Sequence, residues 1–173
     1  INSTYQKLGQ TFQVSTANLK CEKVQLKLGS NGTVPASNAW VEIQDNSGNV
    51  LATSRKIDAT KIGRFSSTNN YWVEFYFDTP YSSFTTSTTY RLALCSDQSY
   101  DASNGIAWCI NSGGGYANGK SQRWDGSSWA DYPSSAYDYC FAIFLTENDS
   151  ALTLPSGYTE QCYVGQVYNN SSS

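Results

Sequence analysis

The chain has 173 residues, of which 39% are hydrophobic and only 14% are charged. This length is enough for one domain with a real hydrophobic core. Eleven basic and fourteen acidic residues give a net charge of −3, which leaves no basic face for a nucleic acid. The longest apolar run, Cys140 to Leu145, is far shorter than the roughly 20 residues that span a bilayer. We therefore expect a soluble domain with no nucleic-acid partner and no membrane insertion.

Large apolar side chains alternate with polar ones along most of the chain. The alternating segments, in chain order, are Val24–Leu28, Val41–Gln44, Trp72–Phe77, Tyr90–Leu94, Ile106–Ile110 and Tyr139–Leu145. Successive side chains of a strand point to opposite faces, so each segment buries one face and exposes the other. No window keeps helical spacing for the roughly 10–12 residues that a helix needs. The pattern predicts an all-β, two-sheet sandwich of about 8–10 strands.

Turn residues separate the predicted strands. The segment Asn46-Ser47-Gly48-Asn49 predicts a tight hairpin, and Asp125-Gly126 between Trp124 and Trp129 predicts a second one. Thr79-Pro80 is expected to end the preceding strand, because proline cannot donate to a sheet.

The composition changes after Glu147. We expect residues 1–147 to form the sandwich, and residues 148–173 to form a linker and an extended C-terminal arm. A turn and one short strand cannot build a core alone. The arm must therefore pack on the sandwich, on a neighbouring subunit or on a further domain. Because the chain opens at Ile1 and contains no methionine, we interpret it as a processed chain or a segment of a longer one.

The chain contains no histidine and five cysteines. The lack of histidine excludes Ser–His–Asp and Cys–His nucleophiles and His-containing zinc sites. An odd number of cysteines cannot be fully paired within one chain, so we expect buried free thiols. Alternate residues share one face of a strand. On this basis, Cys95, Cys109 and Cys140 lie on a face of small residues, opposite the bulky core residues. A Cys95–Cys109 pair remains an alternative if their strands are neighbours.

A series of short motifs runs in order from Leu8 to Leu145. They are Leu8–Val14, Val24–Leu28, Trp40–Gln44, Gly48–Ala52, Trp72–Phe77, Thr88–Leu94, Gly115–Gly119 and Trp124–Trp129. These motifs resemble the jelly-roll, carbohydrate-binding-like sandwich of phage tail fibres, virion decoration proteins and secreted bacterial surface proteins. Leu154 to Ser171 resembles a short C-terminal segment of phage structural proteins, with Cys162 where a polar or basic residue is usual.

The resemblance implies a jelly roll and a non-enzymatic virion structural or adhesion protein, such as a phage fibre or capsid decoration subunit. Its partners would be further copies of itself, other virion proteins and cell-surface polysaccharide, and its location the virion surface or the extracellular space. The arm from Leu152 to Ser173 would then be ordered on a neighbouring chain. The alternative is a monomeric carbohydrate-binding module of a secreted bacterial protein.

A cluster of aromatic and polar residues forms the candidate glycan site. Its members are Tyr116, Arg123, Trp124, Asp125, Trp129 and Tyr132. Sugar recognition needs flat aromatic faces beside hydrogen-bonding groups, and loops on a rigid scaffold often supply them. Under the alternative interpretation, Trp124 and Trp129 pair across the Asp125-Gly126 turn and only close the sandwich edge.

The acidic residues do not suggest catalysis. Glu42 and Glu74 are expected on solvated outer strand faces, whereas Asp97, Asp101 and Asp125 are expected to build turns. We expect no catalytic residues, no metal ligands and no cofactor. A structural calcium ion held by loop oxygens is the one alternative, although no Asp-x-Asp-x-Asp-Gly spacing occurs.

Overall fold

The computed structural model describes residues 1, 6–64, 71–97, 103–111, 116–132, 137–147 and 166–169. In these ranges every regular element is a β-strand except the short 3₁₀ turn η1 (Ala59–Lys61), which confirms the predicted all-β class. No helix in the same ranges has the length and apolar character needed to cross a membrane.

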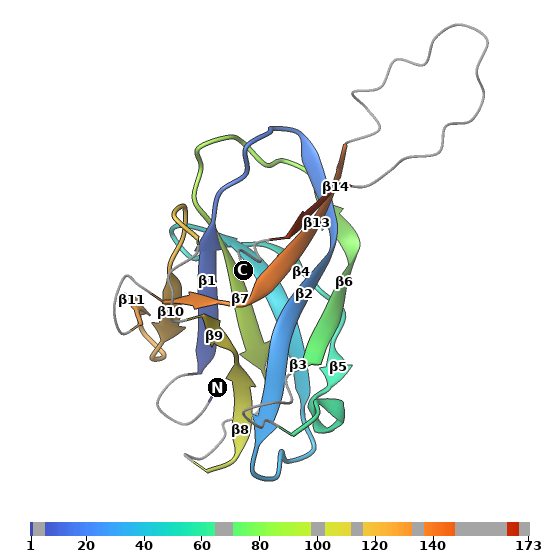
Figure 1. The fold of residues 1–173 in the computed structure, drawn as a ribbon, viewed down its shortest axis with the longest axis vertical. Helices are drawn as coiled ribbons and strands as arrows, with labels where there is room; N and C mark the ends of the chain where they lie inside the picture. The colour runs from blue at the N-terminus through green and yellow to red at the C-terminus, as the bar shows by residue number, and fades with distance from the viewer. Residues whose placement is uncertain are drawn as a thin grey trace, which may run out of the picture.

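The described strands form two main antiparallel sheets (Figure 1). Sheet A has the order β11-β10-β1-β7-β3-β4, with β5 also paired to β3. Its strands are β1 (Lys7–Phe12), β3 (Asn38–Asp45), β4 (Val50–Thr53), β5 (Ile57–Asp58), β7 (Tyr90–Ser96), β10 (Ser121–Trp124) and β11 (Trp129–Asp131).

Sheet B has the order β14-β13-β2-β6, with β8 also paired to β2. Its strands are β2 (Leu19–Asn31), β6 (Tyr71–Tyr81), β8 (Gly105–Trp108), β13 (Phe141–Glu147) and β14 (Gln166–Asn169). A two-stranded piece, β9 (Ile110–Asn111) with β12 (Asp138–Tyr139), continues β8 and precedes β13.

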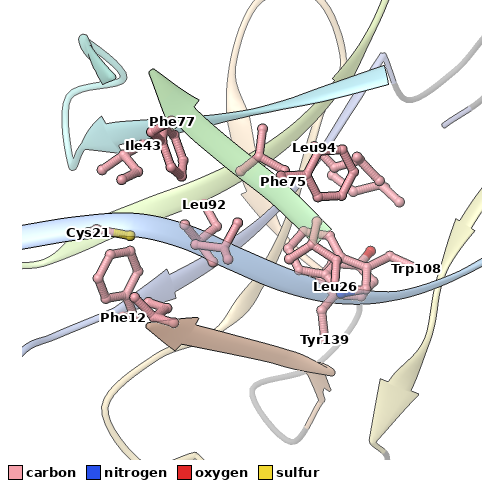
Figure 2. Close-up of a cluster of buried hydrophobic side chains, with 14 of the residues drawn as sticks. Phe12, Cys21, Leu26, Ile43, Phe75, Phe77, Leu92, Leu94, Trp108 and Tyr139 are labelled. Atoms are coloured by element: carbon pink, nitrogen blue, oxygen red, sulfur yellow. The ribbon is translucent and has the colours of Figure 1, made fainter. Parts of the chain in front are cut away.

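The apolar side chains of both sheets meet in one core. Leu92 and Leu94 of sheet A and Leu26 and Phe75 of sheet B are fully buried in the same cluster (Figure 2). These are the residues that the alternation assigned to the inner faces, since each buried residue is followed by an outward one. The result is a β-sandwich-like fold. Alternate residues along its strands point away from the core and form the outer faces of the two sheets.

Both predicted hairpins are present. β3 pairs with β4 across Asn46–Asn49, where Gly48 has a φ of 90°, and β10 pairs with β11 across Asp125–Ser128. The strand that was expected to end at Pro80 instead continues to Tyr81. β6 is an edge strand, and its register with β2 is interrupted between Tyr76 and Tyr81, so Pro80 needs no ladder partner.

Two predicted long strands are each divided by a cysteine. The Ile106–Ile110 segment breaks at Cys109 into β8 and β9, and the Tyr139–Leu145 segment breaks at Cys140 into β12 and β13. These breaks add two strands, and the described residues contain 14 strands in all, more than the expected 8–10. The alternative Cys95–Cys109 pairing is wrong, because Cys95 lies opposite Trp40 in sheet A whereas β8 pairs with β2 in sheet B.

The C-terminal arm is described only at β14. Gln166–Asn169 pairs with β13 of its own chain, with Phe144 opposite Val167. The rest of the segment predicted as a linker and arm lies outside the described residues.

One buried side-chain amide joins β1 of sheet A to β12. Gln10, which has no exposed surface, accepts a hydrogen bond from the Tyr139 N–H (2.7 Å) and donates to Asp138 Oδ1 (3.0 Å). A buried polar group is tolerated only when it is hydrogen-bonded. This pair of bonds fixes where the β12–β13 chain passes over β1.

Replacing Gln10 by leucine should therefore destabilise the protein. Gln10→Leu keeps the size of the side chain but leaves the Tyr139 N–H buried without its acceptor, which costs about 1–3 kcal/mol. The free energy of unfolding from urea titration measures the loss. Gln6→Leu, at an exposed position, is the matched control, and an equal effect of both changes would refute the role of Gln10.

Candidate functional site

The most exposed aromatic side chains of the described residues include three from β6. Trp72 and Tyr76 are each 47% exposed, and they flank Glu74 on the outer side of the strand, while Phe75 and Phe77 are buried beneath them. Residues two apart on a strand share a face. Trp72, Glu74 and Tyr76 therefore form one outward row, about 13–14 Å long at the rise of a strand.

The neighbouring strand β2 adds basic and amide side chains to this row. The register places Lys27 opposite Trp72, Gln25 opposite Glu74 and Lys23 opposite Tyr76. We call the surface formed by these six residues the aromatic face. It lies on the outer side of sheet B, because the alternate residues Val24, Leu26 and Phe75 are buried in the core.

Glu74 is the hydrogen-bonding centre of the aromatic face. Its Oε1 accepts from Lys23 Nζ (2.9 Å) and from Gln25 Nε2 (2.7 Å), and its Oε2 accepts from the Tyr76 hydroxyl. The Lys23 ammonium also lies 4.2 Å from the centre of the Phe144 ring on β13 and 5.6 Å from that of Tyr76. These contacts hold the polar groups between the two exposed rings in a fixed arrangement.

The network changes the acidity of its members. The hydrogen bonds from Lys23, Tyr76 and Gln25 lower the pKa of Glu74 from 4.5 to about 2, and the bond to Glu74 raises the pKa of Lys23 and of Tyr76. Because the pKa of Glu74 is lower in the folded state, its stabilising contribution is present above about pH 4.5. That contribution is lost as the pH falls towards 2. Since the pair is exposed, the contribution is small.

The expectation that Glu42 and Glu74 are simply solvated is wrong for Glu42. It is only 8% exposed on the outer side of sheet A, where it accepts hydrogen bonds from Lys7, Gln44 and Trp40. Glu74 does lie on an outer face, as predicted, but as the acceptor of a built network. The sequence already indicated this surface, because Trp72–Phe77 carries aromatic residues on both faces of the predicted strand.

The sequence-predicted glycan cluster is divided by the structure. Trp124 and Trp129 are directly opposite each other in β10 and β11, with ring centroids 5.6 Å apart, as the alternative interpretation expected. Trp129 also packs on Arg91, whose guanidinium carbon is 4.4 Å from the ring centre. A Cβ on Gly9 would come within 2.7 Å of Trp129. Trp129 therefore covers the outer side of sheet A.

Arg123 and Tyr132 lie apart from this pair. Arg123 has the opposite parity from Trp124 on β10, and its guanidinium covers the ring of Tyr132. Asp125 accepts from the N–H groups of Ser127 and Ser128 (2.8 and 2.9 Å). These turn bonds lower its pKa to about 2. Asp125 thus builds the hairpin turn.

Asp97 has a different part from the predicted one: it accepts from the backbone and side-chain nitrogens of Asn38, so it joins the end of β7 to the start of β3. Asp101 lies outside the described residues.

Tyr116 lines a groove of about 500 Å³ at the end of the sandwich. Phe12, Leu19, Phe141 and Leu145 supply much of its apolar lining. The Tyr116 hydroxyl accepts from the Gln13 N–H (3.0 Å) and donates to the Gln13 carbonyl (3.1 Å). The Tyr116 hydroxyl therefore already has hydrogen-bond partners within the fold. The aromatic face, in contrast, combines exposed rings with a network of polar groups at the surface. We place the candidate site on the aromatic face.

Within the described ranges, no group of three or more acidic or cysteine side chains is arranged to hold a metal ion. No family model and no curated protein matches the chain. The chemistry of the aromatic face is thus the guide to function: two flat apolar rings with a carboxylate, an amide and two ammonium groups between and beside them.

The Lys23–Glu74 contact can be tested by titration. Lys23→Met keeps the aliphatic stem but removes the ammonium, so the pKa of Glu74 should rise from about 2 towards 4.5. A carbon-13 NMR titration of the side-chain carboxyl groups measures it. Lys20→Met is the matched control, because Lys20 pairs with Glu22. If Lys23→Met leaves the Glu74 pKa unchanged, the proposed network does not exist in solution.

Proposed function

We propose that this protein is a non-enzymatic structural or adhesion module that contacts surface glycans through the aromatic face. The observation that carries the proposal is the pair of exposed rings, Trp72 and Tyr76, on either side of the hydrogen-bonded Glu74. Exposed apolar residues that are scattered singly need no explanation, but these two rings share one face of β6 and have a hydrogen-bonded carboxylate between them. A row of about 13–14 Å along one strand suits an extended chain better than a small molecule.

The two kinds of group have separate tasks in this proposal. The rings of Trp72 and Tyr76 accept the C–H faces of sugar units, which are apolar. Glu74 and Gln25 take the hydroxyl groups, since a carboxylate only accepts hydrogen bonds whereas an amide both donates and accepts. Lys27, opposite Trp72, adds a donor for acidic sugars. Because Glu74 is already oriented by its neighbours, less conformational entropy is lost on binding.

The same network argues against Glu74 as the catalytic acid of a glycosidase. A catalytic acid in a glycosidase needs a raised pKa so that it is protonated near neutral pH. The pKa of Glu74 is lowered to about 2, so it remains an anion and a hydrogen-bond acceptor.

Two biological settings fit such a module. The proposed one is a subunit of a phage fibre or capsid decoration, displayed on the virion surface with other copies of itself and related to jelly-roll, carbohydrate-binding-like sandwiches. The second is a free carbohydrate-binding module of a secreted bacterial protein. The pairing of β14 with β13 of its own chain favours this second setting, because the described part of the arm lies on its own sandwich.

Removing either exposed ring should weaken glycan binding. We expect Trp72→Ala and Tyr76→Ala each to reduce the affinity for a polysaccharide that binds the wild type by up to roughly tenfold. We take a ring–sugar contact to be similar to a pair of aromatic rings, which contributes about 0.5–1.5 kcal/mol, and about 1.4 kcal/mol corresponds to a factor of ten. A glycan array selects the polysaccharide, and isothermal titration calorimetry measures the affinity.

Tyr71→Ala is the matched control for these variants. Tyr71 is also exposed on β6 but has the opposite parity and packs against Gly63, so its loss should leave binding unchanged. Trp124→Ala and Trp129→Ala test the sequence-predicted site in the same assay. If only these two variants lose binding, the glycan surface is at the β10–β11 hairpin and the aromatic face is refuted.

Native mass spectrometry separates the two settings. A fibre or decoration subunit should give a closed oligomer whose mass is a multiple of 19.0 kDa, because such assemblies multiply weak contacts by symmetry. A stable monomer across micromolar concentrations would contradict the virion setting and leave the free binding module.

A further inference from the structure

Cys109 and Cys140 lie opposite each other where two divided strands meet. β12 and β9 pair with Asp138 opposite Asn111 and Tyr139 opposite Ile110. One more step of this register brings Cys140 opposite Cys109, and the Cys140 N–H donates to the Cys109 carbonyl at 2.9 Å. Directly opposed residues of antiparallel strands have Cα atoms about 4.5–5.5 Å apart. This lies within the range of about 4.4–6.8 Å that disulfides require.

Lys27 of β2 closes the junction. The Cys109 N–H donates to the Lys27 carbonyl (2.9 Å), and the Lys27 N–H donates to the Cys140 carbonyl (3.1 Å). Together with the Cys140–Cys109 bond, these contacts form a closed ring of three backbone hydrogen bonds. The junction is also fixed from the core side, because the Trp108 indole donates to the Cys140 carbonyl (2.8 Å) and stacks on Tyr139.

The two thiols share one side of the junction. Trp108 and Tyr139, the residues before them, are buried in the core, so Cys109 and Cys140 point the other way, on the side of Lys27. Cys140 is half-buried. Burial raises the pKa of both thiols, and the Lys27 ammonium opposes this rise in each.

The other two described cysteines differ from this pair. Cys21 points into the core (Figure 2). Cys95 is 1% exposed in sheet A.

We propose that Cys109 and Cys140 are a paired dithiol that closes to a disulfide by exchange with a small-molecule disulfide of the glutathione type. The thiolate of the more accessible Cys140 attacks one sulfur of the small disulfide, which forms a mixed disulfide and releases one small thiolate. The Cys109 thiolate then attacks the Cys140 sulfur and releases the second. The two protons of the cysteines end on the two released thiols, so two cysteine thiols are oxidised and one small disulfide is reduced.

A Cys109–Cys140 disulfide would covalently join the two positions at which the strands are interrupted. The link joins the end of β8 to the start of β13, and so covalently fixes the junction that Lys27 holds by hydrogen bonds. Lys27 is opposite Trp72 on β2 and β6, so the dithiol lies beside the aromatic face. The pairing itself is independent of whether that face binds a glycan.

Treatment of the reduced full chain with oxidised glutathione tests the pairing. We expect the intact mass to fall by two hydrogen atoms, and unreduced peptide mapping to show Cys109 linked to Cys140. Dithiothreitol should restore the starting mass. In Cys140→Ser or Cys109→Ser the link should be lost, and the remaining thiol should keep any glutathione that it acquires, because its resolving partner is missing.

Cys95→Ser is the matched control and should form the Cys109–Cys140 link as the wild type does. Circular dichroism and thermal unfolding check that each variant folds, and the wild-type map stands whether or not the variants do. A wild-type map with unlinked Cys109 and Cys140 would overturn the proposal. So would a map with stable glutathione on Cys140, or with either residue linked to Cys162 instead.

Discussion

The pairing of β2 is the constraint on which the rest of the described structure depends. This strand pairs with β6 along one side and with β13 and then β8 along the other. Its inward residues Val24, Leu26 and Leu28 are fully buried. Its outward residues meet the carboxylate of Glu74 and the backbone of both cysteines at the junction. From Lys23 to Leu28, the alternation of side chains therefore gives one strand a core face and a polar outer face at once.

The division of the sandwich into layers could be predicted from local pattern alone. Alternation identifies inward residues because a buried face must be apolar, and the glycine-containing turns mark the hairpins. The same rule separates Arg123 from Trp124, since adjacent residues on a strand point to opposite faces. A sequence cluster of aromatic and polar residues is therefore not yet a site. Parity divides this one into a pair that covers sheet A and a pair on the other side.

Other features depend on partners that are distant in sequence. Gln10 is buried because Asp138 and Tyr139 satisfy its amide, and nothing within β1 reveals this. Similarly, Cys109 and Cys140 interrupt their strands because β2 offers its backbone to both at Lys27. The position of Pro80 is tolerated because β6 is at an edge. Strand order decides all three cases, and a single sequence does not carry strand order.

We propose that the outer side of sheet B is the surface that other molecules contact. The five tryptophans of the chain give separate indole N–H signals in a nitrogen-15 NMR spectrum, and they report on different surfaces. On titration with a binding oligosaccharide, we predict that the Trp72 signal shifts most, while the Trp108 and Trp129 signals stay in place. A titration in which Trp124 and Trp129 shift and Trp72 does not would contradict the account.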